Sequence, residues 1–520
     1  MRHLIVVFLS CVAALSVRAS QSYSPPTFAD PERVARITAV LPKLDALYRD
    51  YAAAQHLPGM IYGVVVDGKL VHTLAIGSAD LTTKTPVSAD TRFRIASMSK
   101  SFTALAILKL RDAGKLSLED PVEKFVPQFS RVEQLTKDSP PVTLRLLLKM
   151  ASGFPQDDPW GDRLLAATGP ELESLVGDGL SYSNAPGTTW EYSNLGYGLL
   201  GQVITQVAGE PYQVYITREI LQPLGMNDTV FEFEGIPAGA FAPGYRWEHD
   251  QWTPEPILHD GTFGAMGGLI TTVGDFANYV AFHLDAWPPR NDHEVGPVSR
   301  ATRREMHRPA DVIAVVADNK TLDGQPNPRV AGYSNGLSWN TDARGIIWVR
   351  HAGGLPGYGS EFRFLPDYGI GIISFANRTY APMTTINAQA MELLVDTAKA
   401  PARTLPPSPA LVQRRAQLVT LIQNWSDPVA AEVLSPNFFL DKARADWAAL
   451  SRDLLAKTGK ISTATDVVPL NQLRGTFELV GEHGRIKAFF TLMPEAIPRV
   501  QALTLTYVPN PAAAAPQEKK

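Results

Sequence analysis

Strand-forming segments that lie far apart in the chain constrain its fold most strongly. Residues 60–80, MIYGVVVDGKLVHTLAIGSAD, indicate two strands joined at Asp67-Gly68, a dipeptide typical of hairpin turns. Residues 345–354 and 360–377, GIIWVRHAGG and SEFRFLPDYGIGIISFAN, also indicate strands separated by turns. Helical signals lie between these segments, including one from Ser97 to Ala113 that stops at Gly114. We therefore predict an α+β fold, with one antiparallel sheet built from distant segments and flanked by helices.

The sequence changes character near residue 400, where APARTLPPSPA is rich in proline and alanine. Because 520 residues exceed one ordinary core, we expect two domains. We predict a main domain at 30–398, a linker at 399–408, a small α+β domain at 409–508 and a flexible tail at 509–520. In the small domain, residues 409–424 and 441–457 have helical spacing, with Asp441 as the N-cap of the second helix, and three strand-like runs follow.

The N-terminus has the pattern of a secretory signal peptide. A basic residue, Arg2, precedes an apolar run from Leu4 to Val17, and Val17-Arg18-Ala19 offers small residues for cleavage. We predict a signal peptide at 1–19 and a secreted or periplasmic protein, with no stable membrane insertion after signal removal. An uncleaved anchor and lipidation of Cys11 are the alternatives. Since Cys11 is the one cysteine, cleavage would leave no thiol for disulfides, catalysis or metal binding.

Charge and histidine spacing exclude two classes of function. The formal net charge of -4 provides no basic surface for a nucleic-acid backbone, so we expect no nucleic-acid partner. The ten histidines are scattered without a metal-ligand spacing such as H-E-x-x-H. We therefore predict no metal site and no cofactor.

Ser97-Met98-Ser99-Lys100 is an S-x-x-K motif at the start of a predicted amphipathic helix. Residues three apart share a helix face, so Ser97 and Lys100 can meet. The positive end of the helix and burial both disfavour an ammonium, which predicts a lowered Lys100 pKa and a base able to activate Ser97. The alternative is a serine N-cap with an exposed lysine. Ser99 is one residue from Lys100 and points elsewhere.

The tripeptide Tyr-Ser-Asn occurs at 182–184, 192–194 and 333–335, and the third copy lies in a G-x-S-x-G frame. A nucleophile elbow requires a buried strand before the serine and a helix after it. Two prolines precede Ser334 instead, and a turn and strand-like spacing follow it. We therefore disfavour an α/β-hydrolase. The copy at 182 precedes a Pro-Gly turn and is expected to cap a loop.

Several segments, taken in order, carry a resemblance to a known family. FRIASMSKSFTALAILKL, VTLRLLLKMASGFP, PGTTWEYSNLGYGLLGQVI, GGLITTVGDFANY and VRHAGGLPGYGSEF resemble the serine β-lactamase and penicillin-binding-protein superfamily. They are most similar to its class C-like branch, which includes D-alanyl-D-alanine carboxypeptidases, D-aminopeptidases and esterases. The resemblance covers roughly residues 30 to 395. It implies a β-lactamase/transpeptidase-like domain with an additional all-helical part.

The resemblance also implies site residues. Ser97 matches the acylated nucleophile and Lys100 its base. The copy at 192 precedes the helix GYGLLGQVI, so Tyr192 would relay the proton to the leaving group, kept acidic by Lys100, and Asn194 would hold the substrate amide or the Lys100 ammonium. His351, Gly353 and Gly354 would line the cleft. The N–H groups of Ser97 and Gly354 would form the oxyanion hole, and His351 would orient Tyr192 or a substrate carboxylate.

One departure from the family pattern bears on the substrate. His351 stands where many family β-lactamases have lysine, and a histidine can be neutral near pH 7. We therefore expect an exported serine hydrolase that acts on small amides or esters, with D-amino-acid peptides first (DD-peptidase or D-aminopeptidase) and esters or β-lactams as alternatives. Its partner would be a small molecule or peptide, with peptidoglycan fragments as one source. A catalytically silent cell-wall-binding protein is the alternative of another class.

Overall fold

The computed structural model describes residues 23–510. The predicted signal peptide at 1–19, Cys11 and most of the predicted tail lie outside these residues. The described chain separates into two compact units, one spanning Phe28–Arg403 and the other formed by residues 23–27 and 404–510. None of the helices in this part of the chain is both long and apolar enough to cross a lipid bilayer.

An antiparallel nine-stranded sheet forms the centre of the first unit, with the strand order β3-β2-β1-β13-β12-β11-β10-β9-β8. Its strands are β1 (Gly59–Val66), β2 (Lys69–Asp80), β3 (Thr85–Pro86), β8 (Asp311–Val316), β9 (Arg329–Ser334), β10 (Leu337–Asp342), β11 (Ile347–Leu355), β12 (Tyr358–Leu365) and β13 (Ile370–Ala376). Met60 of β1 pairs with Ala376 of β13. The sheet is thus built from distant segments, and the α+β prediction is confirmed.

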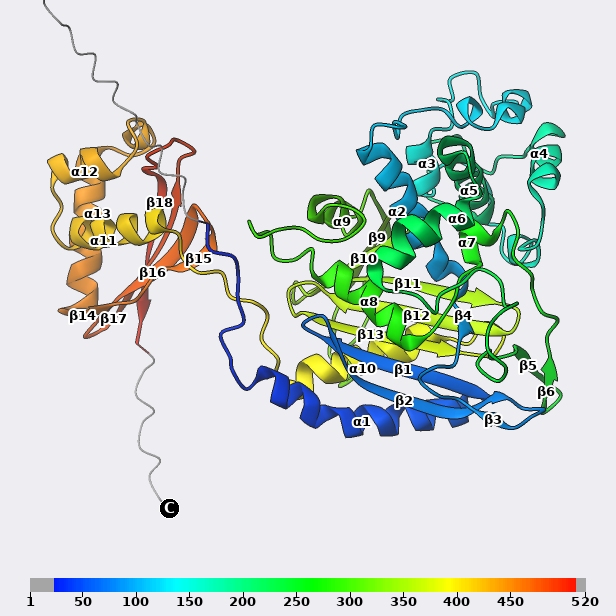
Figure 1. The fold of residues 1–520 in the computed structure, drawn as a ribbon. Coiled ribbons are helices and arrows are strands. Elements are labelled where there is room, and N and C mark those ends of the chain that lie inside the picture. The colour runs from blue at the N-terminus through cyan, green and yellow to red at the C-terminus, as the bar shows by residue number, and fades with distance from the viewer. Residues whose placement is uncertain (1–22, 511–520) are drawn as a thin grey trace, which may run out of the picture. The chain divides into compact units, whose positions relative to one another are not determined.

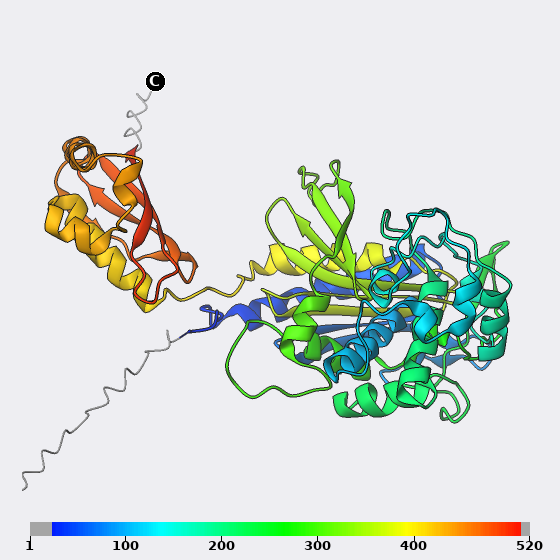
Figure 2. The same ribbon diagram turned by 90° about the horizontal axis from the view of Figure 1, so that it is seen from above.

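Both faces of this sheet are covered by helices, which is why every residue of β1 is buried. Helices α1 (Arg33–Ala54) and α10 (Met383–Ala398) pack side by side on one face (Figures 1 and 2). Helix α8 (Val273–Leu284) covers the other face. Side chains alternate along β1, so Tyr62 and Val64 join the core under α1 and α10. Ile61 and Val65 join the larger core on the opposite face.

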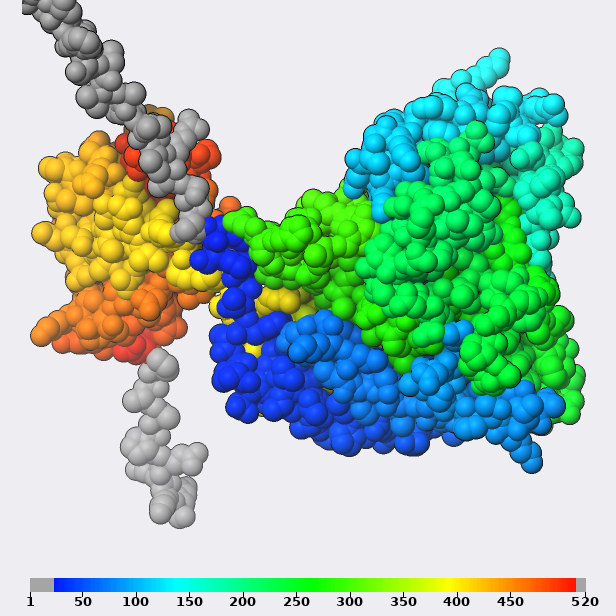
Figure 3. All heavy atoms as spheres, viewed as in Figure 1, coloured from blue at the N-terminus to red at the C-terminus, as the bar shows by residue number. Residues whose placement is uncertain are grey.

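The residues between β3 and β8 form the helical part of this unit. It contains α2 (Ser99–Asp112), α3 (Leu144–Leu148), α4 (Gly169–Gly177), α5 (Asn194–Ala208), α6 (Tyr212–Ile216), α7 (Gly264–Gly267) and α9 (Arg300–Met306). Two short pairings also lie here, β4 (Phe93–Arg94) with β7 (Ile270–Thr271) and β5 (Tyr245–Glu248) with β6 (Gln251–Pro254). In the space-filling view, these middle segments (cyan to green) and the first helix and strands of the same unit (blue) form one continuous surface (Figure 3).

The second unit has its own core and is also α+β. Its helices are α11 (Pro409–Gln423), α12 (Asp427–Val433) and α13 (Arg444–Thr458). Its five-stranded sheet comprises β14 (Ile461–Ala464), β15 (Val468–Asn471), β16 (Arg474–Gly481), β17 (Gly484–Leu492) and β18 (Val500–Pro509). Helix α13 begins three residues later than predicted, with Ala443 in place of Asp441 at the N-cap. The short strands β14 and β15 and helix α12 were not predicted.

Candidate active site

The turn that carries Ser97 lies between strand β4 and helix α2. Ser97 is the middle residue of a short 3₁₀ helix, Ala96–Met98, which leads directly into α2. Ala96 has a φ of 51°, a left-handed conformation that is uncommon for a residue with a Cβ. The turn is held to the sheet because the Ser360 hydroxyl of β12 donates to the Ile95 carbonyl at 2.7 Å. Ser97 is therefore presented by a constrained backbone.

Lys100 lies one helical turn beyond Ser97 and its side chain is fully buried. Its Nζ donates to Ser97 Oγ at 3.0 Å, to Asn194 Oδ1 at 2.7 Å and to the Met266 carbonyl at 2.9 Å. The alternative of a capping serine with an exposed lysine is thus wrong for this structure. Three acceptors surround the amine, and one of them is the hydroxyl that it would activate.

Burial lowers the pKa of Lys100 to about 8, while the carboxylates of Asp162, Asp158 and Asp157 oppose that shift. The direction agrees with the sequence-based prediction. At neutral pH a usable fraction of the amine is unprotonated, as a general base requires. The three aspartates come from the loop that precedes α4.

Tyr192 lies beside this pair. The Lys100 Nζ is 4.9 Å from the centre of its ring, so the ammonium faces the π-system. The prediction that Lys100 keeps the Tyr192 phenol acidic is wrong. Burial raises the pKa of Tyr192 well above its usual value, and the Asp158 and Asp162 charges add to the effect, although a hydrogen bond with Ser97 opposes it. Tyr192 is therefore a protonated phenol that can donate a hydrogen bond or a proton.

Asn194 begins helix α5, and its orientation is set by acidic neighbours. Its Nδ2 donates to Asp158 Oδ1 at 2.5 Å and lies 3.4 Å from Asp162 Oδ1. The carbonyl end of the amide therefore faces Lys100. Of the two predicted roles for Asn194, this arrangement corresponds to holding the Lys100 ammonium.

His351 projects from β11 and is 4% exposed. Its Nδ1 lies 2.6 Å from the Ala352 carbonyl, which can only accept, so Nδ1 carries the proton and Nε2 accepts from the Tyr333 hydroxyl at 3.2 Å. Burial, aided by the Lys100 charge, lowers the pKa of His351 to about 3. His351 is thus neutral and its side chain contacts Tyr333, which was not among the partners that we predicted for it, Tyr192 or a substrate carboxylate.

Gly353 and Gly354 follow His351 along β11 and line the same cavity as Ser97. A Cβ on Gly353 would lie 2.2 Å from the Ile95 carbonyl oxygen and 2.4 Å from Ser360 Oγ. Only glycine allows the strand to pass this close to the turn that carries Ser97. The two glycines therefore set the distance between the strand edge and Ser97.

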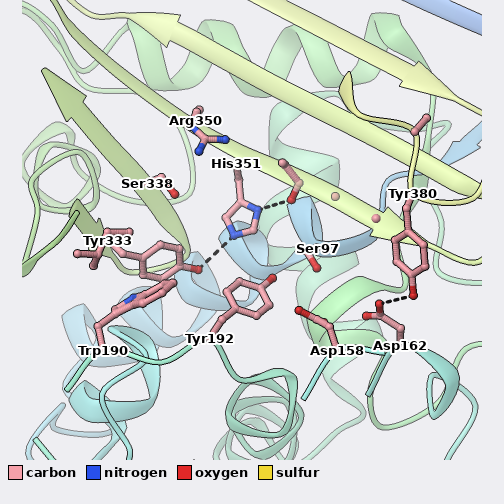
Figure 4. A pocket seen from close by; sticks show the side chains of 15 residues that line it. Ser97, Asp158, Asp162, Trp190, Tyr192, Tyr333, Ser338, Arg350, His351 and Tyr380 are labelled. Carbon is pink, nitrogen blue, oxygen red and sulfur yellow. Dashed lines mark hydrogen bonds between the residues drawn. The ribbon is translucent and has the colours of Figure 1, made fainter. Parts of the chain in front are cut away.

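Ser97, Tyr192, His351, Gly353 and Gly354 meet in a cavity of about 490 Å³ (Figure 4). Lys100 and Asn194 lie just beneath, joined to it through Ser97. Ten further residues complete its walls and were not predicted as site residues: Asp158, Asp162, Trp190, Ile313, Tyr333, Ser338, Arg350, Ala352, Tyr380 and Ala381. The Tyr380 hydroxyl donates to Asp162 Oδ2 at 2.9 Å. Two carboxylates therefore face the cleft. They lie in a segment that the sequence shows only as an irregular loop.

The other two Tyr-Ser-Asn copies have different surroundings. Ser183 Oγ and Asn184 Nδ2 both donate to Glu191 Oε2 at 2.6 Å, so the copy at 182 caps a loop. At the copy at 333, Ser334 ends β9, and Asn335 and Gly336 form the turn into β10 with φ values of 47° and 76°. No helix follows Ser334, so it is not a nucleophile elbow. Tyr333 nevertheless reaches the cleft through His351.

Among the described residues, one group has side chains close enough together to hold a metal ion. Glu232, Glu234 and His259 have candidate ligand atoms within 4.8 Å of one another. None of them lines the Ser97 cavity.

The profile of the Beta-lactamase family matches residues 44–396, well over half of the chain. The chain belongs to the beta-lactamase family. It is therefore a serine hydrolase of that family, with the β-lactamase/transpeptidase-like fold, and the resemblance noted in the sequence is confirmed.

The sequence identity to two individual members of the family is below 30%. "Protein flp" of Staphylococcus aureus is 28% identical over 349 residues, which cover 65% of this chain and 64% of that protein. The "Beta-lactamase-like protein 2" of Dictyostelium discoideum is 27% identical over 385 residues, covering 72% of this chain and 66% of that protein. The chain thus spans less than two thirds of the staphylococcal protein.

Two solved structures share the fold. The octameric penicillin-binding protein homologue from Pyrococcus abyssi has a TM-score of 0.59 and 23% identity, and the match covers 90% of this chain and 96% of that one. A class C beta-lactamase in complex with cefoxitin has a TM-score of 0.54 and 19% identity, covering 69% of this chain and 99% of that one. At these identities the likeness concerns the fold, and the substrate has to be argued from the site.

Proposed function

We propose that this β-lactamase-family hydrolase acts through an acyl-enzyme on Ser97 and that its substrates are D-amino-acid peptides. The observation that carries the proposal is the 3.0 Å contact between Ser97 Oγ and a buried Lys100 whose pKa is lowered to about 8. A neutral amine at this distance can take the hydroxyl proton as Oγ attacks an acyl carbon.

The remaining steps use groups at the same cleft. As the C–O bond forms, charge develops on the carbonyl oxygen, and the N–H groups of Ser97 and Gly354 are the proposed donors to it. Collapse of the tetrahedral intermediate breaks the acyl–nitrogen bond. Tyr192, protonated because its pKa is raised by burial, gives the leaving amine its proton and regains one from Lys100. In the second half of the reaction, water takes the place of the leaving amine and attacks the acyl carbon. The protons then move in the opposite order, and the Ser97 hydroxyl is restored.

The charges of the cleft favour an amino-terminal substrate over a carboxyl-terminal one. Asp158 and Asp162 line the cavity and His351 is neutral, while the one arginine in its wall, Arg350, lies 3.9 Å from the carboxylate of the buried Glu361. An α-ammonium group placed near the buried Asp162 and the exposed Asp158 would be stabilised by ion pairing. Within the class of D-peptides we therefore place aminopeptidase-like hydrolysis ahead of carboxypeptidase-like hydrolysis.

Ester or β-lactam hydrolysis by the same residues is the second candidate. The cleft is lined by Trp190, Tyr333 and Tyr380, whose rings suit a flat acyl group without a charge. Export of the protein, and a peptidoglycan-derived substrate, remain expectations from the sequence.

The test is parallel turnover of a D-alanyl p-nitroanilide, a D-alanyl-D-alanine peptide, a nitrophenyl ester and nitrocefin by the wild type and Ser97→Ala. We expect the free-amine D-alanyl substrate to have the highest kcat/KM, and Ser97→Ala to lose all detectable turnover. Asp158→Asn should weaken the amine substrate more than the ester. Turnover that survives in Ser97→Ala would exclude the mechanism. Peptidoglycan binding without labelling of wild-type Ser97 by a fluorophosphonate or a β-lactam would favour the silent binding protein.

A further inference from the structure

A second cavity, of about 380 Å³, lies on the face of the main sheet that α10 covers. Its walls are the segment 319–327, the strands from β9 to β12 and one side of α10. The residues that matter below are Asn327, Arg329, Trp348, Arg363, Met391 and Val395. None of the residues that line it also lines the Ser97 cavity.

Three buried polar atoms at this cavity have no hydrogen-bond partner among the described residues. They are Arg329 Nε, Trp348 Nε1 and Asn327 Oδ1. A buried polar atom without a partner is costly, and native proteins contain few of them. Two of these three atoms are N–H donors, and the two carboxylates that line the cavity, Asp342 and Glu392, are already engaged by Arg344 and by the Leu322 N–H.

The surrounding charges point to the same deficit. Arg363 pairs with Glu361 at 2.6 Å, and Arg344 pairs with Asp342 at 2.8 Å. Within the described part of the chain, Arg329 has no carboxylate within ion-pair distance. Burial, together with the neighbouring Arg363 charge, lowers the pKa of Arg329. An anion beside Arg329 would accept a hydrogen bond from its unpartnered Nε–H. It would also offset the repulsion between the Arg329 and Arg363 charges.

One part of the cavity wall is apolar. Leu365 of β12 and Met391 and Val395 of α10 line it, and Trp348 packs against the same hydrophobic cluster. We propose that this cavity binds a small organic anion whose carboxylate contacts Arg329 and Trp348 Nε1 and whose apolar part packs against Met391 and Val395. A guanidinium binds a carboxylate through two parallel N–H bonds, which fits an Arg without an internal partner.

Three probes of similar size separate charge from shape: benzoate, benzyl alcohol and benzylamine, each titrated into the full-length chain by calorimetry. We expect saturable binding of benzoate, with benzyl alcohol and benzylamine at least about tenfold weaker. Arg329→Gln should weaken benzoate binding at least about tenfold. Arg308→Gln, which removes an exposed arginine outside the cavity, is the matched control and should leave benzoate binding unchanged.

A steric variant keeps the test decisive if Arg329→Gln does not fold. Ala388 lines the cavity from α10, so Ala388→Phe fills it without changing any charge. We expect this variant to lose benzoate binding and to retain hydrolysis by the Ser97 cleft. Equal binding of the three probes, no saturable benzoate binding, or unchanged benzoate affinity in the folded Arg329→Gln or Ala388→Phe variant would each overturn the proposal.

Discussion

The Tyr333 hydroxyl donates a hydrogen bond to Nε2 of His351 at 3.2 Å, and so joins β9 to β11 at the wall of the Ser97 cleft. Because the Nδ1 proton of His351 is already bound to the Ala352 carbonyl, the ring is satisfied as a neutral imidazole. The strand edge of the cleft therefore carries no positive charge at position 351.

Replacing this neutral ring by a cation should change the substrate preference. We expect His351→Lys to raise the preference for a peptide with a free C-terminal carboxylate over its C-terminal amide by roughly tenfold, because an ammonium can then pair with the carboxylate. The measurement is kcat/KM for the two peptides. Tyr333→Phe is the control, since it removes the donor and leaves His351 neutral. An unchanged ratio in His351→Lys would show that substrates do not approach this strand edge.

The activity should follow the protonation state of Lys100. Because its pKa is lowered to about 8 and the neutral amine is the active form, kcat/KM should rise with pH, reach half of its maximum near pH 8 and level off above about pH 9. Asp162 is the carboxylate that raises this pKa most, so Asp162→Asn should move the rising limb to lower pH. Asp178→Asn, at an exposed position, should not move it. A limb that stays in place in Asp162→Asn would mean that another group titrates.

The Tyr-Ser-Asn copies offer a matched pair of substitutions. Tyr192→Phe removes the proposed proton donor to the leaving group and should reduce kcat by roughly 10²- to 10⁴-fold for amide substrates. Tyr182→Phe removes a buried hydroxyl that has no partner among the described residues, so activity and melting temperature should stay close to those of the wild type. Comparable losses in the two variants would refute a specific role for Tyr192.

Gly353 should tolerate no side chain. In Gly353→Ala the new Cβ would lie 2.2 Å from the Ile95 carbonyl oxygen, so β11 or the Ser97 turn has to move. A displacement of about 1 Å at a catalytic group can cost about 10²-fold in rate, and we expect a loss of this order in kcat/KM. Gly274→Ala is the control, because its nearest neighbouring atom would be 3.8 Å away. Full activity in Gly353→Ala would show that the strand and the turn are not rigidly spaced.

The sequence predicted those features that leave a periodic or local pattern. The helical signal from Ser97 to Ala113 located α2, and the strand pattern with its Asp-Gly turn located β1 and β2. The S-x-x-K spacing placed Ser97 and Lys100 on one helical turn, where the structure also has them. Asp158 and Asp162 were missed as site residues because an irregular loop has no such period. The three carboxylates of QDDPWGD, residues 156–162, were the one signal available.

Contacts between distant segments and the burial of individual side chains could not be predicted from sequence patterns. Tyr333 of β9 and His351 of β11 come together because both strands pair with β10 in the folded sheet. The Tyr192 pKa was misjudged because its dominant cause is burial, which the sequence does not quantify. The unpartnered atoms around Arg329 likewise belong to the packed structure alone.

The pairing of β1 with β13 also bears on how the chain reaches this structure. Met60 and Ala376 are neighbours in the sheet, yet nearly the whole of the first unit separates them along the chain. Contacts of such high sequence separation carry a large loop-closure entropy and slow folding. During synthesis, β1 and β2 emerge long before their partner, so the central sheet closes only after residue 376 has left the ribosome. Until then the edge of β1 that pairs with β13 has no partner, and an unpaired edge of this kind exposes a growing chain to aggregation.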